Sequence, residues 1–280
     1  MWKDSLSIGM ELIDNQHKEL FQKTQELLKE VHNMGVKYKE KCASTIRFLK
    51  NYAAKHFADE ESYQLSVGYK DFESHKKQHD MFIKNISHHD EKMVWSNYAE
   101  KDVKEFTGML VAWLLYHVAG VDQEIEIDSK QCGDSLYCHS EIVCLSVFNV
   151  LNKVAGLDFR LMKKVETHSE SFEDSYAVEM ILAGNLSGYV VVVYPRVLVD
   201  NMIHSMMGFV PEVIDELETS ALFEISSIIC GTICGQITKK RNITCEIQAP
   251  FLTKRSEIHP EERISIDTGK GIIEVDLTII

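Results

Sequence analysis

Two amphipathic segments near the N-terminus carry paired polar side chains at a spacing that strongly restricts the fold. His56 and Glu60 form one pair, and His75 and His79 form the other. Residues four apart lie on the same face of a helix, one turn from each other. Each pair therefore points at one place. A chain that builds such pairs into apolar helical faces is constrained to a helical bundle with a polar centre.

Three further side chains extend this pattern. His17 lies in the preceding amphipathic segment, and His117 and Asp122 end the fourth one. His117 and Asp122 are five residues apart, slightly past one regular turn, and Gly120 between them is a place where the helix could loosen to aim both inward. Four helices that each present one or two ligands to a bundle core form a metal site.

The number and type of these ligands restrict the metal. Five imidazoles and two carboxylates are too many for one tetrahedral zinc and too rich in nitrogen for calcium or magnesium. They suit a pair of first-row metals, and two irons offer about twelve coordination positions. The imidazoles fill five, two bridging carboxylates fill four, and an oxo or hydroxo bridge fills two, which leaves one open for a small diatomic ligand.

The alternative is a bundle of capped or solvated histidines without a metal. Five histidines and two acids in apolar helices would then be unpaired buried polar groups, which are costly. The histidine-rich set also donates less negative charge than the ligands of di-iron carboxylate enzymes. We therefore expect reversible binding of the small ligand rather than oxygen activation.

The first 125 or so residues resemble bacterial hemerythrin. The resemblance rests on Trp2, the run from Gly9 to His17, the Trp113-Leu114 dipeptide, and the ligand residues His17, His56, Glu60, His75, His79, His117 and Asp122 at the family's spacings. It implies a μ-oxo di-iron centre that binds O2 reversibly. It also implies that Trp113 and Leu114 lie near the ligand pocket.

Length and charge limit the remaining possibilities. A chain of 280 residues is long enough for two domains. Its net charge of −13 disfavours nucleic acid and anionic membranes as partners. No apolar run is expected to reach membrane-spanning length, the longest being Tyr189 to Tyr194, and no signal-peptide core is evident. Seven cysteines without a framework spacing fit reduced thiols, so we expect a cytoplasmic protein.

Residues 1–126 are predicted to form an all-α, up-down four-helix bundle. An extended arm over 1–12 precedes helices at about 15–33, 38–65, 70–89 and 98–120, with Gly35 and Gly68 in the turns. Residues 127–138 are polar and aperiodic, as is typical of a linker. Residues 139–280 are predicted to form a second, α+β domain.

This second domain has its own predicted order of elements. We expect helices at about 139–156, 196–207 and 212–239, and strands at about 159–167, 176–183, 186–194, 242–249, 262–268 and 271–279. The stretch from Phe148 to Gly156 aligns without a gap with the stretch from Phe223 to Gly231. Two related helices, each followed by strands, indicate a pseudo-twofold internal repeat.

Residues from about 139 to the end resemble the CheC/CheX class of chemotaxis phosphatases. The resemblance rests on Thr219 to Gly231, Val154 to Gly156, Met206 to Gly208, and Ala249-Pro250. It implies a Glu-x-x-Asn pair that grips a response regulator and orients water for attack on its aspartyl phosphate.

The chain departs from this catalytic pair. Glu224 stands at the glutamate position, but Ser227 replaces the asparagine, and in the first copy Asn152 keeps the asparagine position while Asn149 replaces the glutamate. Loss of a water-orienting group can remove several kcal/mol of transition-state stabilisation. We therefore expect a domain that docks a CheY-like response regulator or forms a homodimer, with phosphatase activity carried by Glu224, Ser227 and Asn152 as an alternative.

Together these features predict a two-domain regulator in which O2 or the redox state of a di-iron centre controls a CheX-like signalling domain. An oxygen carrier or store with an appended dimerisation module, and an oxygen-regulated phosphatase, are the alternatives. The predicted ligand Asp122 ends the fourth helix, which runs almost directly into the linker, so a shift of Asp122 would act first on residues 123–138. The sequence leaves open the oxygen affinity and whether O2, nitric oxide or redox state is the signal.

Overall fold

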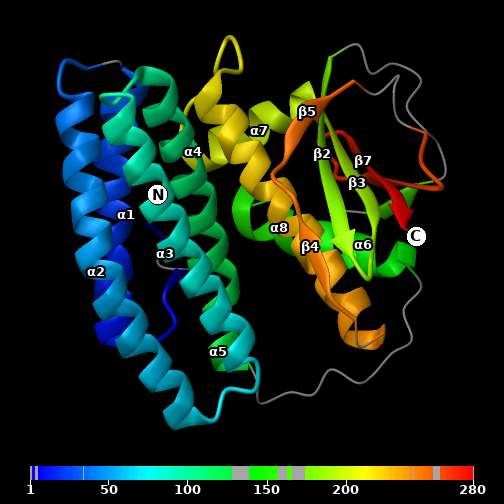
Figure 1. Cartoon of the computed structure of the whole chain (residues 1–280), viewed down its shortest axis with the longest axis horizontal. Coiled ribbons are helices and arrows are strands. Elements are labelled where there is room, and N and C mark those ends of the chain that lie inside the picture. Colours follow the sequence, from blue (N-terminus) through cyan, green and yellow to red (C-terminus); the bar gives the residue numbers. More distant parts are fainter. Residues whose placement is uncertain are drawn as a thin grey trace. The chain divides into compact units, whose positions relative to one another are not determined.

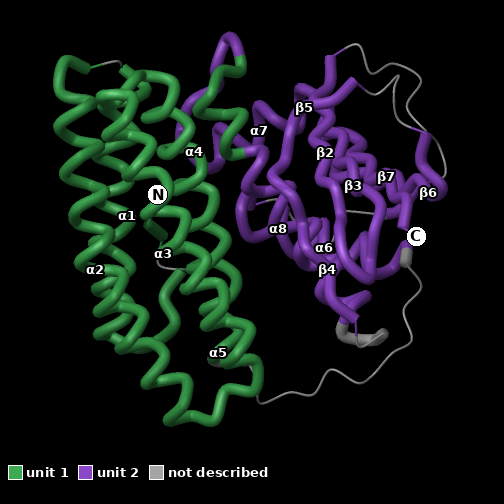
Figure 2. The backbone as a smooth tube through the Cα atoms, in the orientation of Figure 1, with its two compact units in different colours: residues 1–133, 214–221 green, residues 134–213, 222–280 purple. Residues whose placement is uncertain are grey.

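The computed structural model describes residues 2–3, 6–33, 35–127, 139–156, 163–165, 174–241, 243–254 and 259–279. The chain divides into two compact units, residues 1–133 with 214–221 and residues 134–213 with 222–280 (Figure 2). Most of the predicted linker, residues 128–138, lies outside the described residues.

The first unit is built on four long helices that run side by side (Figure 1). They are α1 (Glu11–His32), α2 (Tyr38–Val67), α3 (Phe72–Trp95) and α4 (Glu100–Tyr116). The short connections between them give the predicted up-down bundle. Apolar residues at helical spacing fill its core, among them Leu20, Leu27, Ile46, Leu49, Phe82, Ile86, Phe106 and Leu110.

The helix ends differ from the predicted ones by a few residues. Helix α1 begins at Glu11 rather than near residue 15, and α3 continues to Trp95 rather than residue 89. Gly68 ends α2 with φ 69°, a left-handed conformation that glycine adopts without a steric penalty. Asp14 anchors the preceding arm, because its carboxylate accepts hydrogen bonds from the Ser7 hydroxyl (2.6 Å) and the Ile8 amide (2.8 Å).

The fourth helix changes from α-helical to π-helical hydrogen bonding around Gly120, where the sequence predicted that it could loosen. After Tyr116 the chain forms a π-helical turn, η2 (His117–Val121), which contains Gly120. The Asp122 amide donates to the His117 carbonyl at 3.0 Å, a bond across five residues. A π-helical turn places residues five apart in register, so it aligns His117 with Asp122. The short helix α5 (Glu124–Ile127) follows.

The second unit is an antiparallel sheet with helices. The helices are α6 (His139–Ala155), α7 (Arg196–Met207) and α8 (Glu216–Arg241). The strands are β1 (Lys163–Val165), β2 (Ser175–Gly184), β3 (Gly188–Pro195), β4 (Cys245–Ile247), β5 (Phe251–Thr253), β6 (Glu262–Asp267) and β7 (Ile272–Ile279). The strand order is β1-β6-β7-β3-β2-β4, with β5 also paired to β2. This confirms the predicted α+β class, although the internal repeat stays a prediction.

One feature of this unit was mispredicted, and a second lies mostly outside the described residues. One strand was predicted over 242–249, whereas β4 ends at Ile247 and a separate strand, β5, follows after Pro250. Proline lacks the amide hydrogen needed for continuous pairing, which explains the break. Of the strand predicted at 159–167, only Lys163–Val165 lies among the described residues. The strands predicted at 176–183 and 186–194 form the antiparallel hairpin β2–β3, in which Gly184 ends β2 and Asn185 begins the connection to Gly188.

The expectation that no apolar segment reaches membrane-spanning length was wrong. One stretch among the described helices, Glu216–Thr238 in α8, is long and apolar enough by length and composition. A buried core helix meets the same criteria. Helix α8 has the contacts of such a helix, because the buried Ser226 hydroxyl is hydrogen-bonded to Tyr194 of β3 at 2.9 Å.

Candidate metal centre

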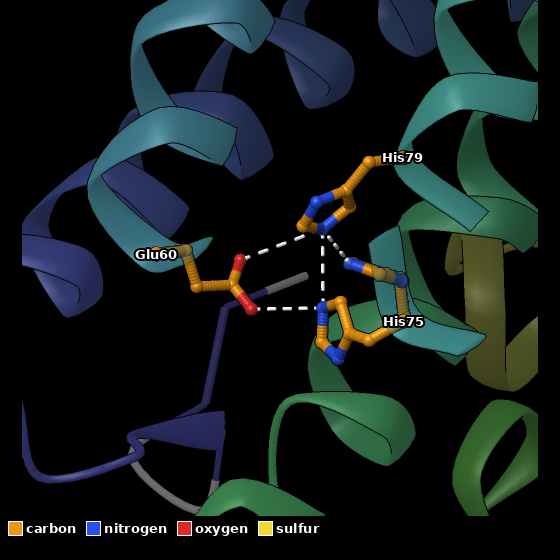
Figure 3. A group of neighbouring side chains, drawn as sticks. Glu60, His75 and His79 are labelled. Carbon is orange, nitrogen blue, oxygen red and sulfur yellow. Dashed lines mark hydrogen bonds and ion pairs between the residues drawn. The ribbon is translucent and has the colours of Figure 1, made fainter. Parts of the chain in front are cut away.

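Three imidazoles converge at the centre of the bundle. His75 and His79 project from α3, and His117 projects from the π-helical turn. The Nε2 atom of His79 lies 3.1 Å from that of His75 and 2.9 Å from that of His117. Glu60 of α2 reaches the same point, with Oε1 2.9 Å from His75 Nε2 (Figure 3). All four side chains are buried.

Two further imidazoles lie on the other side of the carboxylates. His17 of α1 and His56 of α2 have ring centroids 4.8 Å apart. Asp122 Oδ2 is 3.2 Å from His17 Nε2, and Glu60 Oε2 is 3.5 Å from His56 Nε2. Each of the two carboxylates therefore has an oxygen beside this pair of imidazoles.

The same two carboxylates also contact the group of three. Asp122 Oδ1 lies 3.2 Å from His117 Nε2 and 3.4 Å from His75 Nε2. Glu60 contacts His75 through Oε1 and His56 through Oε2. The structure thus brings together all seven predicted ligand side chains, as three imidazoles and two imidazoles with both carboxylates between them.

Burial keeps most of these imidazoles neutral. It lowers the pKa of His17, His56 and His79 to about 4, and lowers the pKa of His117 well below its ordinary value. At neutral pH each of these rings therefore keeps one nitrogen lone pair that can bind a metal, while its other nitrogen carries a proton. Burial also pulls the pKa of His75 down, but its hydrogen bond to Glu60 and the Asp122 charge raise it overall.

The carboxylate that faces these rings stays ionised. Burial opposes the charge on Glu60, but hydrogen bonding and charge interaction with His75 hold its pKa at about 2. Glu60 is therefore an anionic ligand at neutral pH. Neutral imidazoles with anionic carboxylates form the donor set of a first-row transition metal site.

The imidazole nitrogens and carboxylate oxygens of the candidate ligands do not satisfy one another's hydrogen-bonding capacity. The Nε2 atom of His79 faces the Nε2 atoms of His117 and His75 at 2.9 and 3.1 Å, and one ring nitrogen, with either one proton or one lone pair, cannot satisfy both contacts. The buried Glu60 Oε2 atom has no hydrogen-bond partner. Such an arrangement is costly in the absence of a cation. The residues present therefore fit a bound metal.

Outside the ligand set, hydrogen-bonding partners orient the ligands. The amide oxygen of Gln16 lies 2.9 Å from His56 Nδ1, and its nitrogen donates to Asp59 at 2.8 Å. Glu61 Oε1 lies 3.1 Å from His79 Nδ1, and the Lys76 ammonium donates to the same carboxylate at 2.9 Å. Such partners fix the ring orientation and raise the basicity of metal-ligating histidines.

The sequence prediction did not include these outer residues. Gln64 is another of them, since its side-chain nitrogen donates to Glu60 at 2.8 Å from one turn further along α2. The spacing of four residues from Glu60 was a usable signal for Gln64. For Gln16 and Glu61 the only signal was adjacency to a ligand, because their contacts cross between helices.

An apolar cavity adjoins the centre. Its lining includes two of the histidines, His56 and His117, together with Leu20, Leu49, Ala53, Phe57, Phe82, Leu110, Trp113, Leu114 and Val118. The structure places the predicted pocket residues Trp113 and Leu114 here. The Trp113 ring stacks on Phe82 at 3.7 Å and on His117 at 4.4 Å, which fixes one wall.

In the second unit the predicted catalytic residues are divided between two helices. Glu224 and Ser227 lie one turn apart on α8, and both are partly exposed. Burial raises the pKa of Glu224 to about 7. Asn152 is exposed on α6. Neither helix carries a glutamate and an asparagine at the family's spacing.

Two solved chemotaxis proteins match about half of this chain, with TM-scores below 0.5. Chemotaxis protein CheX from Vibrio vulnificus matches over 53% of this chain and 100% of that chain, with 15% identity and a TM-score of 0.44. The CheX–CheY–BeF3–Mg complex from Borrelia burgdorferi matches over 51% of this chain and 97% of that chain, with 16% identity and a TM-score of 0.43.

The first unit has relatives by sequence. The family model for the hemerythrin HHE cation-binding domain matches residues 8–126. A bacteriohemerythrin from Clostridium acetobutylicum is 36% identical over 127 residues, which are 44% of this chain and 96% of that protein. By the sequence of its first unit, this chain belongs to the hemerythrin family.

Proposed function

We propose that the bundle holds two iron ions and binds O2 reversibly at one of them. His75, His79 and His117 would hold one iron, His17 and His56 the other, and Glu60 and Asp122 would bridge the two. The support is the arrangement of the carboxylates, since Glu60 and Asp122 each lie beside both imidazole groups.

The number of donor atoms available to each of the two irons indicates which iron would bind O2. With three imidazoles, two carboxylate oxygens and one solvent-derived bridge, an iron has about six donors and is saturated. With two imidazoles it has about five, so one position stays open. A di-iron pair with one open position supplies reversible O2 binding. This asymmetry between three and two imidazoles carries the proposal.

The chain's own residues control access to that position. The apolar cavity touches His56 of the two-imidazole group and His117 of the three-imidazole group, so an O2-sized ligand inside it would lie beside the centre among apolar side chains. Trp113, Leu114 and Phe57 form apolar walls that exclude water. Gln16 and Glu61 hold the rings of His56 and His79 in their ligating orientations.

We infer that the oxygen-binding unit serves as a sensor rather than as a store. The support is the second unit, whose Thr219–Gly231 stretch resembles a chemotaxis signalling helix. Asp122 follows the π-helical turn, and its carbonyl accepts a hydrogen bond from Ile125 of α5 at 3.2 Å. A shift of Asp122 on oxygen binding would therefore be passed to α5 and to the residues that follow.

The partner of the second unit is a CheY-like response regulator or a second copy of the chain. With Ser227 in place of the asparagine, docking is favoured over dephosphorylation. A serine hydroxyl is shorter than a carboxamide, and it reaches less far toward a partner's phosphate.

The decisive experiment is an optical spectrum of the iron-loaded full chain, recorded without oxygen and after oxygen is admitted. We expect about two irons per chain and a charge-transfer band that appears with O2 and disappears when O2 is removed. His56→Ala should abolish the band, whereas His88→Ala, at an exposed position of α3, should preserve it. One metal or none per chain, without an oxygen-dependent band, would refute the proposal.

The sensor role needs a second measurement on the same samples. We expect binding to a CheY-like regulator, or self-association, to differ between the deoxygenated and oxygenated chains. Reversible oxygen binding without any such difference would favour the carrier or store.

A further inference from the structure

The start of helix α8 packs against α4 inside the first unit. Residues 214–221 belong to this unit, whereas residues 222–241 of the same helix belong to the second unit (Figure 2). The Ser220 hydroxyl donates a hydrogen bond to the Glu105 carbonyl of α4 at 2.6 Å. We call this packing of residues 214–221 on α4 the α4–α8 contact.

A glycine sets how closely the two helices approach. A Cβ atom added at Gly108 of α4 would lie 2.0 Å from the Leu217 carbonyl oxygen and 3.0 Å from the Ala221 amide nitrogen. These are backbone atoms of a helix, so they cannot rotate aside to make room. Glycine is also unfavourable inside a helix, and Gly108 is an interior residue of α4. The contact with α8 therefore explains this glycine better than the needs of α4 do.

An ion pair adds to the α4–α8 contact. The Lys104 ammonium of α4 lies 2.6 Å from the Asp215 carboxylate and 2.7 Å from the Glu100 carboxylate. Burial opposes the charge on Lys104, but its hydrogen bonds with Asp215 and Glu100 raise its pKa overall. Asp215 also caps α8, because its carboxylate accepts a hydrogen bond from the Leu217 amide at 2.8 Å. Lys104 therefore holds the residue at which α8 begins.

Glu224 lies on the face of α8 that makes this contact. It is four residues after Ser220 and seven after Leu217, which is the spacing of one helical face. Leu217, Ser220 and Ala221 are all buried. One turn further along the helix, Glu224 is only partly exposed, and burial raises the pKa of its carboxyl to about 7. A partner that binds Glu224 must therefore approach a face whose preceding turn is already packed on α4.

We propose that the α4–α8 contact is autoinhibitory, because it packs the face of α8 that a response regulator needs in order to reach Glu224. Opening requires residues 214–221 to leave α4. The ion pair in the contact is partly exposed to solvent, and such pairs are weak, so the contact suits reversible opening. The inference rests on the proposed function in one respect, which is that a CheY-like regulator is the partner.

The test measures how readily Glu224 reacts in the iron-loaded full chain, kept without oxygen. The probe is a water-soluble carbodiimide with glycinamide, which couples to accessible carboxyl groups, and the labelled peptides are identified by mass spectrometry. Gly108→Ala prevents the close approach of the two helices. We expect it to make labelling of Glu224 roughly tenfold faster, which corresponds to the net loss of about one hydrogen bond from the closed state.

The matched control is Gly235→Ala, which replaces a glycine of α8 where an added Cβ would meet nothing within 4 Å. Both substitutions favour the helix that carries them, so a difference between them reports on the contact. Gly235→Ala should leave the labelling of Glu224 unchanged.

A second variant covers the case in which Gly108→Ala disturbs the bundle. Lys104→Met removes the ion pair with Asp215 and should also speed the labelling of Glu224, by a smaller factor. Its control is Lys41→Met, which removes an ion pair with Glu26 on the surface of the bundle and should have no effect. If neither Gly108→Ala nor Lys104→Met speeds the labelling, the α4–α8 contact does not cover Glu224 and the inference is wrong.

Binding of a CheY-like regulator to the same chains completes the test. We expect Gly108→Ala to bind the regulator up to about tenfold more tightly, because more of the chain is in the open state. Equal affinity of the Gly108→Ala and unsubstituted chains would overturn autoinhibition alone. Binding by neither chain would refute the partner assigned under the proposed function, and the inference would fall with it.

Discussion

Removal of iron should make the bundle sensitive to mild acid. In the iron-free chain His17, His56 and His79 are buried and neutral, with a pKa of about 4 against 6.5 for an unconstrained imidazole. The unfolded chain therefore binds more protons than the folded one between these two values. Stability is full above about pH 6.5 and falls as the pH falls toward 4.

The magnitude follows from the size of the shift. At about pH 5 an imidazole with a folded pKa near 4 stays mostly neutral, whereas in the unfolded chain it is protonated at a gain of about 2 kcal/mol. Three such groups give up to about 6 kcal/mol. His75, whose pKa is raised, opposes this loss. Glu60, with a pKa of about 2, adds a further loss only below about pH 4.5.

Tryptophan fluorescence can follow the bundle alone, because all three tryptophans, Trp2, Trp95 and Trp113, belong to the first unit. We expect the urea midpoint of the iron-free chain to fall strongly between about pH 7.5 and pH 5. The iron-loaded chain should keep its midpoint until protons displace the metal.

Two substitutions make this prediction specific. His17→Leu removes one buried titrating group and should reduce the pH-dependent loss by about 2 kcal/mol. His88→Leu, at an exposed position, should leave the loss unchanged. If the iron-free midpoint did not change over this range, the imidazoles would not be buried and neutral, and the reasoning would be refuted.

Four further predictions concern the neighbours of the site and the second unit. Glu61→Ala removes the partner of His79 and should weaken iron retention about 10–100-fold in a chelator-exchange assay, whereas Glu26→Ala, paired with Lys41 at the surface, should not. Leu114→Ala should lower the free energy of unfolding by about 2–5 kcal/mol and admit water to the cavity, seen as faster decay of the oxygenated spectrum; a spectrum as long-lived as that of the unsubstituted chain would contradict this role. Ser227→Asn restores the family's pair beside Glu224 and should raise hydrolysis of a phosphorylated CheY-like regulator, and no gain would show that the pair alone is insufficient. Replacing residues 128–138 by glycine and serine should abolish the oxygen dependence of partner binding while the oxygen spectrum persists; output that still follows oxygen would exclude this route.

The ligand set was predictable because its spacing is local. A difference of four residues places two side chains on one helical face whatever the rest of the fold does, so the His56/Glu60 and His75/His79 pairs could be identified without a structure. The spacing of five between His117 and Asp122, with Gly120 between, indicated the irregular turn that the structure forms as a π-helix. The prediction of one strand over 242–249 missed the separate strand β5 beyond Pro250, because a short apolar pattern does not show that a second segment pairs with β2 there.

The sequence by itself identified the seven candidate donor side chains, the helical class of the first unit and the α+β class of the second. Only the tertiary structure decided how the donors divide into three and two imidazoles, that Glu60 and Asp122 lie between them, and that Gln16 and Glu61 orient the rings. The physical reason is that helical periodicity fixes which side chains share a face, whereas the distance between two faces is set by how the helices and strands pack.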